Sequence, residues 1–279
     1  MAITAPHGDG TSTTGRAASK WRRVAFRGVS VGVVVVVLLV FLGGLAEMVL
    51  MWLSDATLLS LIDDLAPADL QYRGQFIHVG VVAWAIVPPL VVQLRTPSRR
   101  VAPMLQALAV AIASVVVFPL AGAPELLDVA VLAAVGLMAW LHPCAGELVR
   151  RPRLYDRQAR IIAVGAVPWL AMAWFNLFEA RDAATSDSIA DVPPRVLWGH
   201  SALVPVVIVL VALVGSTDHR GWRLPAWTAT VAAVVVGVHA LAYPAQAASL
   251  SAPWAVAAIA WGLAFAMATV HRSRRAEAA

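Results

Sequence analysis

The chain has few charged residues and a single cysteine. Charged side chains make up 13% of its 279 residues and hydrophobic ones 60%, whereas about 25% of a typical soluble domain is charged. A water-soluble fold cannot cover so much apolar surface with so few charges. The lone Cys144 excludes an intrachain disulfide and any site built from several cysteines. These shortages exclude a cytosolic enzyme, a secreted disulfide scaffold and a disordered chain, and they favour a multi-pass membrane protein.

Long apolar runs account for most of the chain. Eight of them reach or approach the roughly 20 residues that a membrane-spanning helix needs. They cover 29–53, 76–94, 101–121, 126–142, 161–178, 197–215, 226–245 and 253–270. The first run is too long for a signal peptide, so we expect an uncleaved first helix. The sequence therefore predicts an all-α fold with eight transmembrane helices.

The positive charges alternate between the two sides of these spans. Eighteen of the 21 Lys and Arg residues lie in the N-terminal tail, in the loops after the second, fourth and sixth spans, or in the C-terminal tail. Only Arg73, Arg181 and Arg195 fall on the other side. Because cytoplasmic loops carry the excess of positive charge, we expect both termini in the cytoplasm of a bacterium, with the protein in its inner membrane. The net charge of +5 then faces anionic membrane lipids, and nucleic acid is not an expected partner.

The eight spans divide into two halves that share a motif. Arg73 and His78 have the same spacing as Arg195 and His200, and each pair opens the second span of its half. An even number of spans per half predicts two parallel four-helix repeats, related by an axis along the membrane normal. The expected organisation is a disordered tail (1–20), a first half (21–142), a basic linker (143–160), a second half (161–271) and a C-terminal tail (272–279).

Histidines at the span ends are the main candidates for chemistry. Almost no polar residue lies at the centre of a span, which disfavours ion-coupled transport of hydrophilic solutes. His78, His200 and His239 instead lie at the outer ends of three spans. Two histidines on facing helices suit a haem b, and three suit a copper ion. If the ligand is a haem, we expect Arg73 and Arg195 to pair with its propionate groups.

If the ligand is a metal ion, we expect Glu47, near the outer end of the first span, to be a further ligand. His142 and His271 form a corresponding pair at the inner side, where a second haem would complete a path for electrons. All these histidines also suit a membrane interface without any ligand. The leading prediction is a membrane protein with a histidine-ligated haem b or copper site, serving electron transfer or metal handling.

Two other functions remain open on the sequence. The first is a permease or flippase for an apolar or lipidic molecule, because the lack of polar residues at mid-span does not exclude transport of such a molecule. Trp84, Trp169 and Trp261 are expected to be buried, where they suit contact with an apolar ligand, a quinone or a haem face. Alternatively, the acidic outer loops, 54–75 and 179–196, suit docking to other subunits of a membrane complex.

Overall fold

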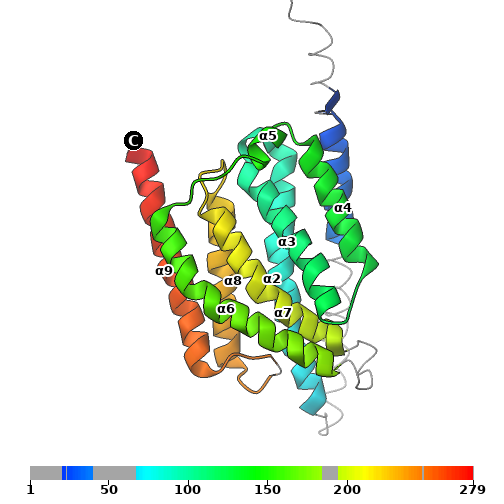
Figure 1. Ribbon diagram of the computed structural model, residues 1–279, viewed down its shortest axis with the longest axis vertical. Helices are drawn as coiled ribbons and strands as arrows, with labels where there is room; N and C mark the ends of the chain where they lie inside the picture. The colour runs from blue at the N-terminus through cyan, green and yellow to red at the C-terminus, as the bar shows by residue number, and fades with distance from the viewer. Residues whose placement is uncertain (1–20, 23, 40–66, 184–193, 247, 279) are drawn as a thin grey trace, which may run out of the picture.

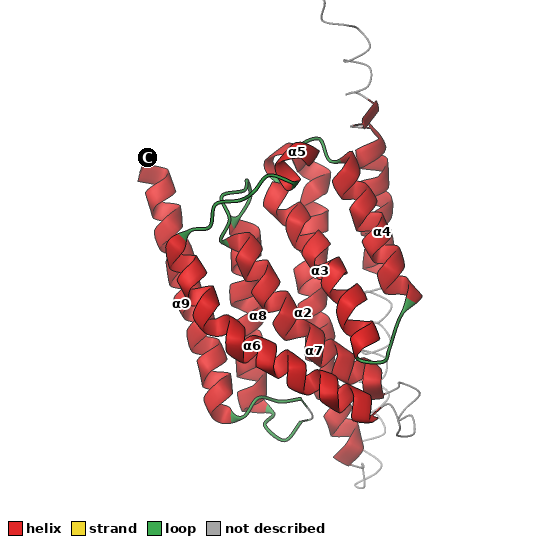
Figure 2. Cartoon of the chain, viewed as in Figure 1, coloured by secondary structure: helices red, strands yellow, loops and turns green. Residues whose placement is uncertain are grey.

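The computed structural model describes residues 21–22, 24–39, 67–183, 194–246 and 248–278. Regular structure in these ranges is helical, apart from one isolated β-bridge between Leu154 and Thr217 (Figure 2). Most of the two acidic loops, the N-terminal tail and Glu47 lie outside the described residues.

Eight long helices and two short ones make up the described fold (Figure 1). They are Val24–Leu39, α2 (Pro67–Arg95), the 3-10 helix η1 (Pro97–Arg99), α3 (Val101–Leu120), α4 (Leu126–Leu141), α5 (Ala145–Leu148), α6 (Asp156–Ala183), α7 (Pro194–Gly215), α8 (Arg223–Ala242) and α9 (Ala252–Ala278). Six of these, α2, α3, α6, α7, α8 and α9, contain a segment long and apolar enough to cross a membrane. The predicted all-α, multi-pass architecture is confirmed at this level.

The count of eight spans stays a prediction. Val24–Leu39 and α4 are apolar but shorter than the other six. The first predicted run, 29–53, continues into residues that the structure does not describe. The prolines inside α2, α6 and α7 do not end these helices, because neighbouring helices can satisfy freed carbonyl groups in a membrane bundle.

The core of the bundle lies around α7, which packs against α2, α3, α6 and α8. Leu203 and Ile208 of α7 and Met104 of α3 are fully buried. Helices α6 and α9 are much less buried than α3 and α7. In Figure 1, α9 forms one edge of the molecule and α6 runs obliquely across it. These two helices are therefore the least buried of the six long apolar helices.

The basic loops meet at one end of the bundle, which we call the basic end. The backbone N–H of Tyr155 donates to the Ser216 carbonyl at 2.8 Å, and that of Ala102 donates to the Arg220 carbonyl at 2.9 Å. The described start of the N-terminal helix and the end of α9 lie at this same end (Figure 1). The loops that the charge pattern assigns to one side therefore do share a side. That this side is cytoplasmic stays a prediction.

Two helices are longer at the basic end than the sequence pattern predicts. α6 begins at Asp156 instead of 161, and α9 continues through the predicted tail to Ala278. The guanidinium of Arg272 explains the second extension, because it donates to the carbonyls of Gly215 and Thr217 at 3.2 and 2.7 Å. The polar end of α9 thus packs onto the loop between α7 and α8.

Candidate functional site

The outer histidines lie on three helices. His78 of α2 is 4% exposed, and its Nδ1 lies 3.1 Å from the Ser201 Oγ of α7. His200 precedes Ser201 on α7, and His239 lies on α8. Nothing in the sequence indicates this contact between Ser201 and His78, because the two residues lie on different helices.

Each outer histidine has one ring nitrogen committed to a protein group. His200 donates Nδ1–H to the Val196 carbonyl at 2.9 Å, and His239 Nε2 bonds to the Gln246 amide oxygen at 2.8 Å. Such bonds orient an imidazole and leave its other nitrogen for a ligand. Within the described residues, however, no three His, Cys, Asp or Glu side chains are arranged to hold a metal ion.

The described residues do not include every predicted partner of these histidines. The backbones of Arg73 and Arg195 lie in the first turns of α2 and α7, but their side chains are not described. The structure therefore leaves the predicted propionate contacts untested, and Glu47 likewise.

The two inner histidines have different surroundings. His142, the residue after α4, is 1% exposed. Its ring packs edge-on against Phe26, and its Nδ1 accepts the Cys144 backbone N–H at 3.1 Å. Burial is the main effect that lowers the pKa of His142 below its usual value. His271 instead lies beside arginines in a polar pocket. No described contact joins His142 to His271.

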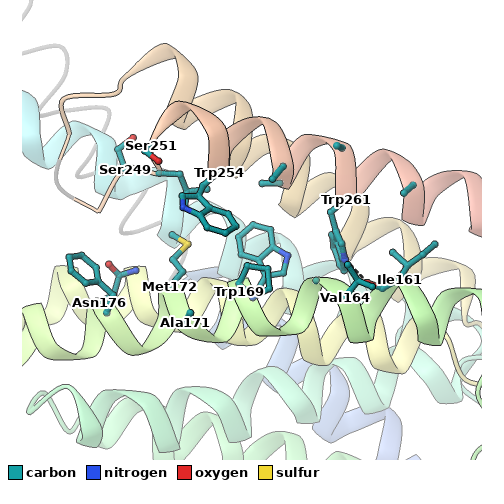
Figure 3. A pocket seen from close by; sticks show the side chains of 18 of the residues that line it. Ile161, Val164, Trp169, Ala171, Met172, Asn176, Ser249, Ser251, Trp254 and Trp261 are labelled. Carbon is teal, nitrogen blue, oxygen red and sulfur yellow. Dashed lines mark hydrogen bonds between the residues drawn. The ribbon is translucent and has the colours of Figure 1, made fainter.

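A groove of about 980 Å³ lies between α6 and α9. Trp169, Met172 and Asn176 line it from α6, and Trp254 and Trp261 line it from α9 (Figure 3). Its remaining lining is mostly alanine and other apolar side chains. Trp169 and Trp261 were expected to be buried, and they are 5% and 9% exposed. Trp84 was expected to be buried as well, but this is wrong, because it is 47% exposed on α2.

Trp261 sets the spacing between α6 and α9. Its indole N–H donates to the Ile161 carbonyl at 2.9 Å, and the ring covers Gly165, where any Cβ would collide with it. The same ring meets Trp169 edge-on at 6.1 Å and stacks on Phe265 at 5.5 Å. These aromatic rings lie between the two helices beside the groove, whereas hydrogen bonds between Gln158 of α6 and both Thr269 and Arg272 of α9 join the helices at the basic end.

Polar residues lie at both ends of the groove. Asn176 donates its amide N–H to the Ser201 carbonyl at 3.0 Å, which links the groove to the residue that holds His78. At the basic end, Arg160 lines the groove and also a second, polar pocket of about 370 Å³. Sequence reasoning missed Arg160 and Gly165. Gly165 and Arg160, five residues before it on α6, give no signal of a groove until the partner helix is known.

The fold and the groove define a class, a multi-pass helical membrane protein with a lateral apolar groove between two of its membrane-spanning helices. Comparison of the chain with models of protein families, with curated proteins and with solved structures found no match.

Proposed function

We propose that this protein binds a lipidic molecule in the groove between α6 and α9 and carries it within the membrane, as a permease or flippase does. The observation that carries this proposal is the apolar, aromatic lining of the groove on the two least buried spans. A hydrocarbon chain can enter such a groove sideways from the bilayer, without crossing water.

The length of the groove suits a lipid chain. Its apolar lining on α6 extends from Ile161 to Phe175, which corresponds to about 21 Å at the helical rise of 1.5 Å per residue. That is roughly two thirds of the 30 Å hydrocarbon core. The residues recur at helical spacing along one stripe of α6. An acyl or isoprenoid chain, including the tail of a quinone, therefore has a continuous apolar path.

The topology completes this proposal. In the proposed topology, eight spans form two parallel four-helix halves, and both termini face the cytoplasm of a bacterial cell. The groove then belongs to the second half, and its basic end faces the inner leaflet. The charge pattern of the loops supports this orientation.

Photo-crosslinking tests whether the groove binds lipid. The full chain is reconstituted in phosphatidylcholine vesicles with a phosphatidylcholine probe that carries a diazirine on its acyl chain. Labelled peptides are then mapped by mass spectrometry. We expect labelling to be several times denser on the groove faces of α6 and α9 than on the exposed face of α4. The substitution Ala260→Trp fills the groove and should remove the excess labelling.

Ala130→Trp is the matched control. Ala130 is exposed on α4, whereas Ala260 lines the groove. The control should leave the groove labelling unchanged. Equal labelling of α4 and the groove in the wild-type protein, or full labelling of the groove in Ala260→Trp, would show that the lipid only surrounds the protein.

Metal handling at the outer histidines is a second candidate function. The specific observation behind it is that His78 of α2 bonds to Ser201, the neighbour of His200 on α7, and that His78, His200 and His239 each have one ring nitrogen already oriented by a protein group. The remaining ring nitrogens are suitable ligands for copper, and a haem with two axial imidazoles is the other possibility that the sequence raises.

Two measurements on protein purified from its native membrane test this second function. A dithionite-reduced minus oxidised visible spectrum detects haem, and elemental analysis detects copper or zinc. We expect His78→Ala and His200→Ala to lose the chromophore or metal, and His7→Ala in the N-terminal tail to retain it. If both His78→Ala and His200→Ala retained all of the bound haem or metal, these histidines would not be its ligands.

A further inference from the structure

A cluster of arginines lines the polar pocket at the basic end of the groove. Arg157 and Arg160 come from the first turns of α6, and Arg275 comes from the last turns of α9. His271, Tyr155 and the carboxylate of Asp156 complete the polar lining. With His271 neutral, three positive charges face one negative charge, so the pocket is suited to an anion.

These three arginines differ from others at the basic end. Arg150, Arg220 and Arg223 form ion pairs with Asp218, Glu147 and Glu277, respectively. In the part of the chain that the structure describes, Arg157, Arg160 and Arg275 have no ion-pair partner of this kind. Three guanidinium groups gathered in one pocket repel one another, and an anion between them would relieve that repulsion.

The position of Arg160 joins this pocket to the apolar groove. Its side chain lines both cavities, and a long arginine side chain commonly has its stem on apolar surface and its charge at the polar end. We infer that the anionic headgroup of a phospholipid binds among Arg157, Arg160 and Arg275 while its acyl chain lies in the groove. This inference rests on the proposed function and specifies its ligand class.

The chemistry of the pocket favours a phosphate group. Guanidinium groups bind phosphate oxygens through two parallel hydrogen bonds. Basic pockets between transmembrane helices at the cytoplasmic side are suited to anionic lipid headgroups. A soluble phosphate compound would use the pocket alone and leave the groove, which Arg160 also lines, empty. A phospholipid uses both, with polar and apolar parts in the order that the two cavities provide.

The experiment compares two diazirine lipids with identical acyl chains, phosphatidylglycerol and phosphatidylcholine, at equal mole fraction in vesicles. Each arginine near an anionic lipid contributes about a fivefold preference. We therefore expect phosphatidylglycerol to label the groove at least about fivefold more than phosphatidylcholine. The triple variant Arg157→Gln, Arg160→Gln, Arg275→Gln should lose this preference and still be labelled by phosphatidylcholine, which shows that its groove is intact.

A matched triple variant removes three other arginines near the basic end, through Arg95→Gln, Arg99→Gln and Arg151→Gln. These residues do not line the pocket, so the preference should persist. If the first triple variant does not fold, Arg160→Gln alone should reduce the preference about fivefold. Equal groove labelling by both lipids in the wild-type protein, or an unchanged preference in the pocket variants, overturns the headgroup site. Absence of excess groove labelling with either lipid overturns the proposed function itself.

Discussion

The two sides of α9 differ in how closely they approach their neighbours. Toward α8, glycines permit close contact, since a Cβ on Gly237 would lie 2.6 Å from the Ala255 carbonyl oxygen and one on Gly262 would lie 2.9 Å from Val234. Toward α6, the indoles of Trp254 and Trp261 and the ring of Trp169 occupy the space. One helix thus has a tightly packed side and a side that lines a groove.

This difference shows how a membrane protein can form a groove without a hydrophobic driving force between helices. Lipid chains are as apolar as the side chains, so helices associate through close packing and hydrogen bonds. Small residues fix α9 to α8. Large aromatic residues keep α9 away from α6, and polar contacts near the basic end hold the pair together. Substitutions that break these contacts one at a time should show how the α8–α9 and α6–α9 contacts differ. They are given below from the largest expected effect to the smallest.

Gly237→Val should have the largest effect because it inserts two methyl groups and a Cβ against the backbone of α9, which cannot move aside easily. We expect a loss of about 3 kcal/mol, the upper end of the range for overpacked cores. The loss would appear as a lower thermal unfolding midpoint in detergent. Gly80→Val is the control, because nothing lies within 4 Å of a Cβ there. Equal losses in both variants would mean that close α8–α9 packing is unimportant.

Arg272→Gln should have the next largest effect because it loosens the α6 side at the basic end. The guanidinium lies 3.7 Å from the centre of the Trp222 ring and donates to Gln158 Oε1 at 3.0 Å, in addition to its two carbonyl partners. Bonds from a charged donor contribute about 2 kcal/mol, so we expect a loss of that size in the free energy of unfolding.

The matched control for Arg272 is Arg223→Gln. Arg223 pairs with Glu277 at 2.9 Å, but both side chains are more than half exposed. An exposed pair contributes less than about 1 kcal/mol. The comparison would be contradicted if the two variants were equally destabilised.

Gly165→Ala should have a smaller effect on stability and a clear effect on the groove. Its methyl group displaces the Trp261 indole and breaks the bond to the Ile161 carbonyl, which contributes about 1 kcal/mol. We expect the lipid-labelling pattern of α6 and α9 to change. Gly136→Ala, where a Cβ meets nothing within 4 Å, should leave that pattern unchanged. An identical pattern in Gly165→Ala would mean that Trp261 does not shape the groove.

The sequence predicts the helices much better than the site. Apolar runs and arginine-rich loops identify the spans and their shared side, because length and charge act locally along the chain. The Ser201–His78 contact joins residues 123 positions apart, and the Trp261–Ile161 bond joins residues 100 apart. Such pairs depend on which helices are neighbours, which hydropathy does not specify. The histidines can be recognised as candidates from the sequence alone. The groove cannot, because it depends on how α6 lies against α9.

Acid should have the smallest effect, and it should act on the attachment of α6 and not on the glycine contacts of α9. Asp218 accepts the Arg153 backbone N–H at 3.0 Å and a bond from Arg150 at 3.1 Å. Partial burial by itself raises the pKa of Asp218, but these bonds and the Arg150 charge outweigh it and hold the pKa below its ordinary value. Because the pKa of Asp218 is lower in the folded state than in the unfolded state, its contribution to stability is complete above about pH 4 and is lost as the pH falls through the folded pKa.

Asp218→Asn should therefore be less stable than the wild-type protein at pH 7, and the difference should shrink toward pH 3. Unfolding midpoints measured across this range would contradict the expectation if the difference stayed constant, and the α6 attachment would then be independent of this carboxylate.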